Sequence, residues 1–453
     1  MFGTDGVRGV ANTYISPDLC FKLGRAAGLL ILQKGLAPSV VIGRDTRISG
    51  SMLGAALASG FAHVGVNVTT LGVFPTGGIS YITRTQGFSM GAVISASHNP
   101  APDNGVKFLA HDGRKITEAD EAALVAMLEP AYEIPVGEHV GTVLPNPTYT
   151  RAYLDFLVGL VPERLDDMTV AIDGAHGAGY ELGSEVFSSL GAKVIKTGVH
   201  PNGNNINHEV GATHPATIQE LTKTSGADFG IAYDGDADRA VFSDPQGRLI
   251  NGDRLMAIWC DHWKENLEPK AVVGTVMSNG GFASAMERSG ISLHRANVGD
   301  KYVAAKMDEL GGKIGGEQSG HIIFSERGPT GDGLITALEF ARVVRRSGRP
   351  VTELFDIYQP WPQLLANVQV SDKDAFKNSA EVQQAIVAAE SELGGHGRIN
   401  VRASGTQPMV RVMVEADAYD LRDRVLDQVV AAFEEHIGVE KVKRVDLTHA
   451  LGD

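Results

Sequence analysis

Hydrophobic residues along this chain gather in short runs, and each run is followed by a glycine-rich or polar loop and then by a helical pattern of apolar positions. This alternation continues to about residue 350 and is typical of βα units, in which a buried strand precedes a helix. The clearest predicted strands are residues 40–43, 170–172, 229–233 and 272–276. Because open α/β sheets bind ligands at the carboxyl ends of their strands, we expect the functional residues in the loops that follow.

Helix start signals agree with this layout. Ser16 followed by Pro17 predicts a capped helix with proline at its first position, and Thr117 precedes an acidic first turn. The segment 135–147 is rich in proline and glycine, so we place a domain boundary within it or just after it.

The pattern changes after residue 362. Predicted strands at 397–401 and 409–415 accompany predicted helices at 374–393 and 420–436, which is typical of a small α+β domain. At 453 residues the chain also exceeds what one core usually serves, and three or four domains fit its length. We therefore predict an α/β protein with three similar α/β domains with mixed sheets plus a C-terminal α+β domain, bounded at 1–150, 151–251, 252–365 and 366–453.

Composition narrows the possible partners. A net charge of −14 argues against nucleic acid and anionic membranes, so local arginines must capture any anionic substrate. The N-terminus lacks a basic and apolar leader, and no apolar stretch is long enough to span a bilayer, so we expect a cytoplasmic protein. Cys20 and Cys260 form no metal or redox motif, and we expect buried free thiols.

The first candidate for chemistry is the segment 95–100, Ser-Ala-Ser-His-Asn-Pro, which directly follows the apolar run 92–94. A parallel strand there would deliver Ser97 into a cleft, where its hydroxyl could carry a phosphoryl group covalently. A serine in a polar loop is more often a turn or cap residue. A metal motif and an anion motif elsewhere in the chain favour the carrier role.

The metal motif is formed by Asp234, Asp236 and Asp238, which alternate along one loop. Their carboxylates can therefore face one side and surround a hard cation such as Mg²⁺. An EF-hand calcium loop is excluded, because Arg239 and Pro245 stand where it needs glycine and glutamate. A purely structural role would leave three like charges repelling one another. The spacing thus predicts a divalent metal site.

A phosphate site is predicted between the last two strands. Arg402, Ser404 and Thr406 could bind a phosphate there, and Gly405 would allow its close approach. An ordinary turn between two strands is the alternative. Arg411, on the following strand, could assist or simply lie on the strand surface.

Further candidates lie in two other loops. Glu317 and Ser319 suit the hydroxyls of a sugar, and His321 could bind an anion or be a satisfied loop histidine. Lys107 and Arg8 could neutralise a phosphate or move a proton, although isolated basic residues are more often solvated surface charges.

In combination, these segments resemble the signature stretches of the α-D-phosphohexomutase superfamily, in the family's order and along nearly the whole chain. The matching stretches are residues 2–9, 95–100, 234–239, 316–321 and 402–408. The resemblance implies four domains around a central cleft, each supplying one loop, and it suggests a homodimer that takes a small-molecule sugar phosphate.

The resemblance also implies a role for each candidate. Ser97 would carry the phosphoryl group as phosphoserine and would contact one Mg²⁺ per chain together with the three aspartates. His98 and Arg8 would lie beside it, Lys107 would assist proton transfer, and Arg239 would orient the metal loop. The residues implied in substrate binding are Glu317, Ser319, His321, Arg402, Ser404, Gly405, Thr406 and Arg411.

The implied activity is an isomerisation of glucosamine 6-phosphate to glucosamine 1-phosphate through a hexosamine 1,6-bisphosphate, which supplies amino-sugar nucleotides for cell-wall synthesis. The glucosamine preference rests on Gln318, because phosphomannomutases more often have methionine there. Phosphomannomutase or phosphoglucomutase activity and a non-catalytic sugar-phosphate-binding role are the alternatives. The chain departs from the family pattern at Gln407, at His176 and in beginning at the first motif, which leaves a short first strand.

Overall fold

The computed structural model describes residues 1–3, 5–129, 132–404 and 408–449. The chain divides into two compact units. One unit contains Met1–Val276 and Leu293–Phe355, and the other contains Met277–Ser292 and Asp356–Asp453. Three of the four sheets lie entirely or largely in the first unit, and the fourth lies in the second.

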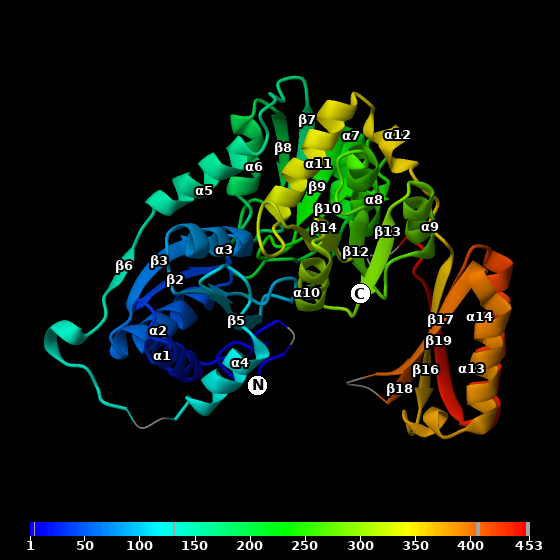
Figure 1. Cartoon of the computed structure of the whole chain (residues 1–453), viewed down its shortest axis with the longest axis horizontal. Coiled ribbons are helices and arrows are strands. Elements are labelled where there is room, and N and C mark those ends of the chain that lie inside the picture. The colour runs from blue at the N-terminus through cyan, green and yellow to red at the C-terminus, as the bar shows by residue number, and fades with distance from the viewer. Residues whose placement is uncertain (4, 130–131, 405–407, 450–453) are drawn as a thin grey trace. The chain divides into compact units, whose positions relative to one another are not determined.

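The first sheet is six-stranded and mixed (Figure 1). Its order is β1 (Val7–Val10), β5 (Asp103–Ala110), β4 (Met90–Ile94), β2 (Ser39–Arg44), β3 (Asn67–Val73), β6 (Val143–Pro145). The central strands β4, β2 and β3 are parallel, and β5 runs antiparallel to both β4 and β1. The prediction that a parallel strand leads into the Ser97 loop is therefore confirmed.

Helices of this region begin where their capping signals predicted. Ser16 caps α1 (Pro17–Gln33) by accepting a hydrogen bond from the Leu19 amide, and Thr117 caps α4 (Glu118–Ala126) in the same way. The others are α2 (Gly50–His63) and α3 (Thr76–Thr85). Apolar faces of α1 and α2 pack with the strands into one core.

A second mixed sheet has five strands, in the order β11 (Leu249–Ile250), β10 (Ala240–Ser243), β9 (Phe229–Tyr233), β7 (Thr169–Asp173), β8 (Lys193–Thr197). Strands β7, β8 and β9 are parallel, whereas β10 returns antiparallel beside β9. The loop from β9 to β10 carries the aspartate motif. The accompanying helices are α5 (Thr148–Gly159), α6 (Leu182–Ser189) and α7 (Ala216–Ser225).

The third sheet has four strands, in the order β13 (Ser292–Ala296), β12 (Ala271–Thr275), β14 (Ile314–Gly316), β15 (Ile322–Phe324). Strands β12 and β14 are parallel, and β14 and β15 form a hairpin. The turn between β14 and β15 contains the predicted sugar-binding residues. The helices of this region are α8 (Gly252–Trp263), α10 (Asp300–Leu310), α11 (Gly333–Ser347) and α12 (Val351–Phe355), whereas α9 (Gly280–Arg288) belongs to the second compact unit.

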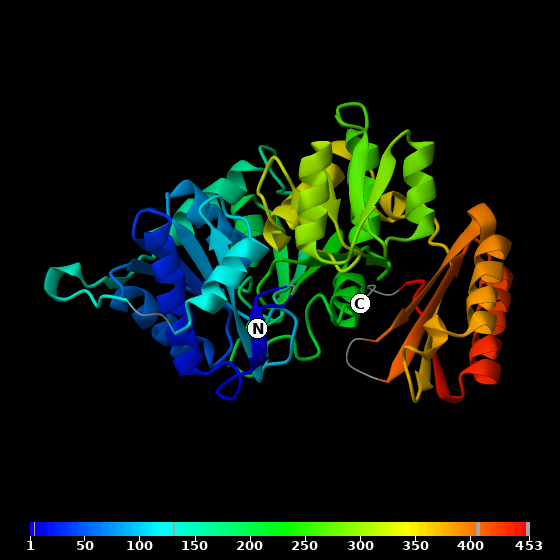
Figure 2. The same cartoon turned by 60° about the horizontal axis from the view of Figure 1, so that its bottom comes forward.

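The C-terminal sheet is antiparallel throughout, in the order β17 (Gly397–Ala403), β18 (Met409–Ala416), β16 (Gln363–Val370), β19 (Val439–Asp446). Helices α13 (Ala380–Leu393) and α14 (Tyr419–His436) lie side by side against one face of it (Figure 1, Figure 2). The predicted helix start at residue 374 is wrong: a 3₁₀ turn occupies Ala375–Lys377, and Ser379 caps α13. Three mixed α/β sheets and one α+β region confirm the predicted fold class.

Two predictions from composition are also tested. Both cysteines, Cys20 and Cys260, are buried free thiols, as expected. Among the residues that the structure describes, no helix combines the length and the apolar character needed to cross a bilayer.

Candidate active site

Ser97 lies directly beyond the carboxyl end of β4 and is 1% exposed. Its hydroxyl donates a hydrogen bond to Oδ2 of Asp234 at 2.6 Å, across 137 positions of sequence. The Nδ1 atom of His98 lies 3.4 Å from the same hydroxyl. The serine loop and the metal loop therefore meet at the Ser97 side chain.

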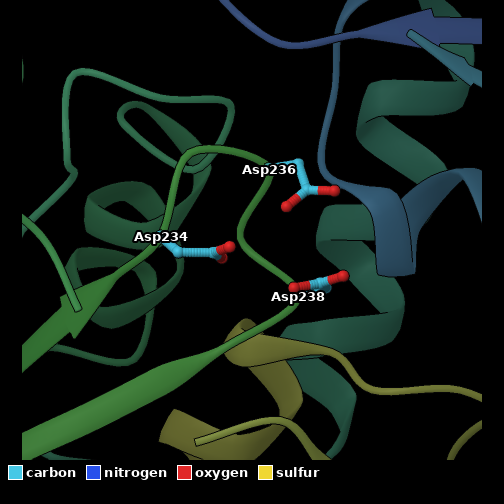
Figure 3. A group of neighbouring side chains, drawn as sticks. All are labelled: Asp234, Asp236 and Asp238. Carbon is cyan, nitrogen blue, oxygen red and sulfur yellow. The ribbon is translucent and has the colours of Figure 1, made fainter. Parts of the chain in front are cut away.

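The three aspartates follow β9 on one loop and are all buried (Figure 3). One carboxylate oxygen from each lies within 4.8 Å of the other two. Burial, together with the charges of Asp238 and Asp236, raises the pKa of Asp234 well above its usual range. This cluster of like charges at low exposure is the arrangement that a bound cation would neutralise.

The donor set fits a hard divalent cation. Within the part of the chain that the structure describes, Oδ1 of Asp236 and Oδ1 of Asp238 are buried and have no hydrogen-bond partner, although an unsatisfied buried carboxylate oxygen is costly. Carboxylate oxygens are the ligands that Mg²⁺ prefers. The residues that would hold Mg²⁺ are therefore Asp234, Asp236 and Asp238, with the Ser97 oxygen beside them.

Lys107 brings positive charge to this cluster from β5. It is 1% exposed, and its Nζ lies 2.8 Å from Oδ2 of Asp236 and 3.3 Å from Oδ2 of Asp238. Burial alone would lower the pKa of Lys107, but these carboxylates outweigh it and raise that pKa, so the amine stays protonated. Arg8 pairs with Asp5, whose other contacts include Nζ of Lys107 at 3.2 Å.

The turn between β14 and β15 contains three of the predicted substrate-binding residues. Glu317 is half-buried, and its Oε1 accepts a hydrogen bond from the Gly299 amide at 2.9 Å. Ser319 and His321 are buried. The His321 ring lies between two carboxylates, 3.7 Å from Asp238 and 3.5 Å from Asp300. Although burial acts to lower it, these carboxylates raise the pKa of His321.

In the C-terminal unit, Arg402 on β17 lies directly opposite Arg411 on β18 in the antiparallel register. Opposed residues share a face of the sheet, so the two guanidinium groups extend from one side. Ser404 is 6% exposed, and its carbonyl accepts a hydrogen bond from Nζ of Lys373 at 2.8 Å. Gly405, Thr406 and Gln407 lie outside the described residues.

Several residues of the site carry no motif of their own. Thr76 opens α3 and donates from its hydroxyl to Oδ2 of Asp236 at 2.7 Å, while its amide donates to the Asp236 carbonyl. Asp300 opens α10 and pairs with Lys115 at 2.7 Å. Both stand just after a strand and a loop, at a helix start, which is the one local signal that would have flagged them.

Family models match consecutive parts of the chain. They describe the phosphoglucomutase/phosphomannomutase alpha/beta/alpha domains I, II and III at residues 1–133, 147–247 and 251–361, and the C-terminal domain at residues 365–432.

Known relatives cover almost the whole chain. The phosphoglucosamine mutase of Geobacillus thermodenitrificans is 42% identical over 444 residues, which is 97% of this chain and 99% of the relative. That of Brevibacillus brevis is 45% identical over 440 residues, which is 94% of this chain and 98% of the relative.

Solved structures share the fold. A phosphoglucomutase/phosphomannomutase family protein from Burkholderia thailandensis matches with a TM-score of 0.81 at 24% identity, over 97% of this chain and all of that one. The Aspergillus fumigatus N-acetylphosphoglucosamine mutase, solved with GlcNAc-6P and magnesium, matches with a TM-score of 0.67 at 19% identity, over 96% of this chain and 95% of that one. The motifs, the four sheets and these matches establish that the chain belongs to the phosphoglucomutase/phosphomannomutase family.

Proposed function

We propose that this enzyme interconverts glucosamine 6-phosphate and glucosamine 1-phosphate, with Ser97 as a covalent phosphoryl carrier. The observation that carries the proposal is the 2.6 Å contact between the Ser97 hydroxyl and Asp234, inside a buried carboxylate triad that Lys107 faces. A nucleophile, a cation site and a buried ammonium group are the components that phosphoryl transfer requires.

In the forward direction, the bond between phosphorus and Oγ of phospho-Ser97 breaks as a bond from phosphorus to the sugar O1 forms. The O1 hydroxyl loses one proton and Ser97 Oγ gains one, so the step is balanced without an external acid or base. We assign the relay of that proton to Lys107, with His98 and Arg8 stabilising charge on the transferring group. Bound Mg²⁺ would neutralise further charge on the phosphoryl oxygens.

The resulting 1,6-bisphosphate must turn over and return the O6 phosphoryl group to Ser97. We assign the phosphate that is not reacting to Arg402, Arg411 and Ser404, with Gly405 and Thr406 completing that loop. The opposed arginines support this assignment, because two like charges on one face are relieved by an anion between them. Arg239 supports the metal loop, since its amide donates to Oδ1 of Asp234 at 3.2 Å.

Glucosamine is the proposed sugar for two reasons. The relatives at 42% and 45% identity are phosphoglucosamine mutases, and the proposed sugar loop has glutamine at position 318. Gln318 is 3% exposed and its Oε1 has no hydrogen-bond partner among the described residues, so it could accept a bond from a 2-ammonium group. We assign the sugar hydroxyls to Glu317 and Ser319, and His321 to the same site.

Intact mass measured before and after addition of glucosamine 6-phosphate tests the carrier role. We expect one phosphoryl group on the purified enzyme, its discharge by substrate, and no such group on Ser97→Ala, which should also lose interconversion. Ser89→Ala is the matched control, because Ser89 is a buried serine of the same sheet region whose hydroxyl donates to the Ala37 carbonyl and whose amide donates to the Ser39 hydroxyl. Interconversion by Ser97→Ala at the native rate would contradict the proposal.

Sugar choice is a separate measurement. Comparing kcat/KM for the 6-phosphates of glucosamine, glucose and mannose should rank glucosamine first. A higher value for mannose or glucose would instead assign phosphomannomutase or phosphoglucomutase activity to the same scaffold.

A further inference from the structure

Arg47, in the loop after β2, is 1% exposed, and every one of its guanidinium N–H groups has a hydrogen-bond acceptor. Nε donates to Oδ2 of Asp45 at 2.8 Å. The remaining donors all reach main-chain carbonyls of the serine loop and of the first residue of β5. NH2 donates to the carbonyls of Ser97 at 2.9 Å and Asn99 at 2.8 Å, and NH1 donates to those of Pro100 and of Asp103, the latter at 3.0 Å.

The Arg47 guanidinium is also linked to the backbone amide of Ser97, through Asp45 and Ser95. Oδ2 of Asp45, which holds the guanidinium, accepts a hydrogen bond from the Ser95 hydroxyl at 2.6 Å. That hydroxyl oxygen in turn accepts the Ser97 amide at 2.8 Å. Both the N–H and the C=O of the carrier residue are therefore tied to one buried ion pair, Asp45–Arg47, whose side chains are both fully buried.

The backbone of Ser97 needs this support. Its φ is +50°, in the left-handed region that a residue with a Cβ rarely adopts and that persists only where the surroundings over-determine it. Asn207, from the second sheet region, adds two more donations to the carbonyls of Ser97 and Asn99, at 2.9 and 3.2 Å. The orientation of the Ser97 hydroxyl toward Asp234 thus depends on the hydrogen bonds that Arg47 and Asn207 donate to the backbone carbonyls of this loop.

We infer that Arg47 is a positioning residue, which fixes the backbone of Ser97 so that its oxygen meets the metal cluster in a reactive orientation. This inference rests on the proposed function, because it requires Ser97 to be the carrier. Lysine cannot replace Arg47, since an ammonium group has three donors at one point and cannot span acceptors on both sides of a planar fork. A displacement of the serine oxygen by about 1 Å is enough to slow transfer by about 100-fold.

The test compares Arg47→Lys with native enzyme in a single-turnover discharge of the phosphoryl group to glucosamine 6-phosphate. We expect the discharge rate and kcat to fall by about 100-fold while KM is unchanged. Arg44→Lys is the control, because Arg44 neighbours the same ion pair but its guanidinium donates, among the described residues, only to the Asp45 carbonyl. It should discharge at the native rate.

Chemical rescue distinguishes a positioning role of the Arg47 guanidinium from a merely structural role of this side chain. We expect millimolar guanidinium to restore part of kcat to Arg47→Ala, and ammonium at equal ionic strength to restore none. If neither Arg47 variant folds, Ser95→Ala removes the acceptor of the Ser97 amide together with the hydrogen bond to Asp45, and it should slow discharge without changing KM.

Native discharge by Arg47→Lys, or by Ser95→Ala where the arginine variants do not fold, would overturn the inference, and so would a loss of activity that appears only in KM. Absence of a phosphoryl group that depends on Ser97 in the native enzyme would instead overturn the proposed function itself.

Discussion

The serine–metal centre and the phosphate loop of the C-terminal unit are both rich in charge, but they differ in how that charge is satisfied. At the centre, Lys107 contacts two of the three aspartates and Ser97 contacts the third. In the C-terminal unit, Arg402 and Arg411 face each other and neither has an ion-pair partner among the described residues.

The difference separates two tasks. Charges that must be in place when a bond breaks are held by the protein itself, because preorganised groups need no rearrangement during the reaction. Side chains that bind a substrate phosphate, in contrast, keep their hydrogen-bond donors available for the ligand. Changes at the centre should therefore affect kcat and stability, and changes at the phosphate loop should affect KM.

Loss of the metal should have the largest effect. Chelation, or the substitution Asp236→Asn, should lower kcat by at least about 10³-fold, because a metal contributes several kcal/mol to stabilising transferred charge. Mg²⁺ should also raise Tm of the native enzyme through binding to the folded state, and should raise it less in the variant. Asp308→Asn, at an exposed ion pair, is the control. Full activity after chelation would contradict a cation role for the triad.

Removal of the ammonium group at position 107 should come next. Lys107→Met keeps the stem of the side chain but leaves Asp236 and Asp238 without their cation, so we expect kcat to fall by about 10³-fold and stability to fall by about 3 kcal/mol. Kinetics and urea unfolding measure the two effects. Lys34→Met breaks an exposed pair with Asp120 and should change neither. If Lys107→Met changed only KM, the serine–metal centre would not differ from the phosphate loop in the proposed way.

The contacts explain which parts of this centre could be predicted from sequence. The three aspartates alternate within five residues and Ser97 follows a buried strand, so their signals are local. Thr76 and Asn207 reach the same centre from distant segments and resemble ordinary helix-start and loop residues. Their roles depend on how the sheet regions pack together, which no local pattern encodes.

In the fold, too, the features that could be predicted are those with a local sequence signal. The Ser16 cap and the strand at 229–233 were predicted from neighbouring residues, and both are confirmed. The helix start at 374 was wrong because apolar Phe376 extends the helical pattern, although it lies in a 3₁₀ turn before the Ser379 cap.

The pH dependence of stability reports on Asp332, a buried carboxyl group close to the metal loop. Asp332 caps α11 and accepts a hydrogen bond from Tyr153, and the next amide, of Gly333, donates to the carbonyl of Ala237 in the metal loop. Burial raises the pKa of Asp332 from 3.8 to about 6. The folded state therefore holds this proton more tightly than the unfolded state, and stability falls as pH rises between those values.

Asp332→Asn should remove that pH dependence, because asparagine also caps helices and carries no charge. Relative to native enzyme, the variant should gain up to about 3 kcal/mol of unfolding free energy between about pH 4 and pH 7. Tyr153→Phe should enlarge the native dependence, since the tyrosine hydroxyl favours the ionised form. Parallel stability curves for native enzyme and Asp332→Asn would show that Asp332 ionises freely in the folded state.

The smallest effect should come from the phosphate loop and should be confined to binding. Arg402 is exposed, so Arg402→Ala should leave the unfolding free energy within about 0.5 kcal/mol of native. Loss of a charged hydrogen bond to phosphate should raise KM for glucosamine 6-phosphate by about 10–100-fold. Arg411→Ala should act in the same direction, because the two side chains share one face of the sheet.

Steady-state kinetics of both variants, beside Arg424→Ala at an exposed pair with Glu392, measures this effect. Arg402→Lys should recover part of the affinity, since it restores the charge without the two-pronged contact. If Arg402→Ala instead lowered the rate at which phospho-Ser97 is discharged at saturating substrate, the C-terminal arginines would belong to the reacting centre. The contrast between charges that the protein itself pairs and charges that it leaves for the substrate would then no longer describe this enzyme.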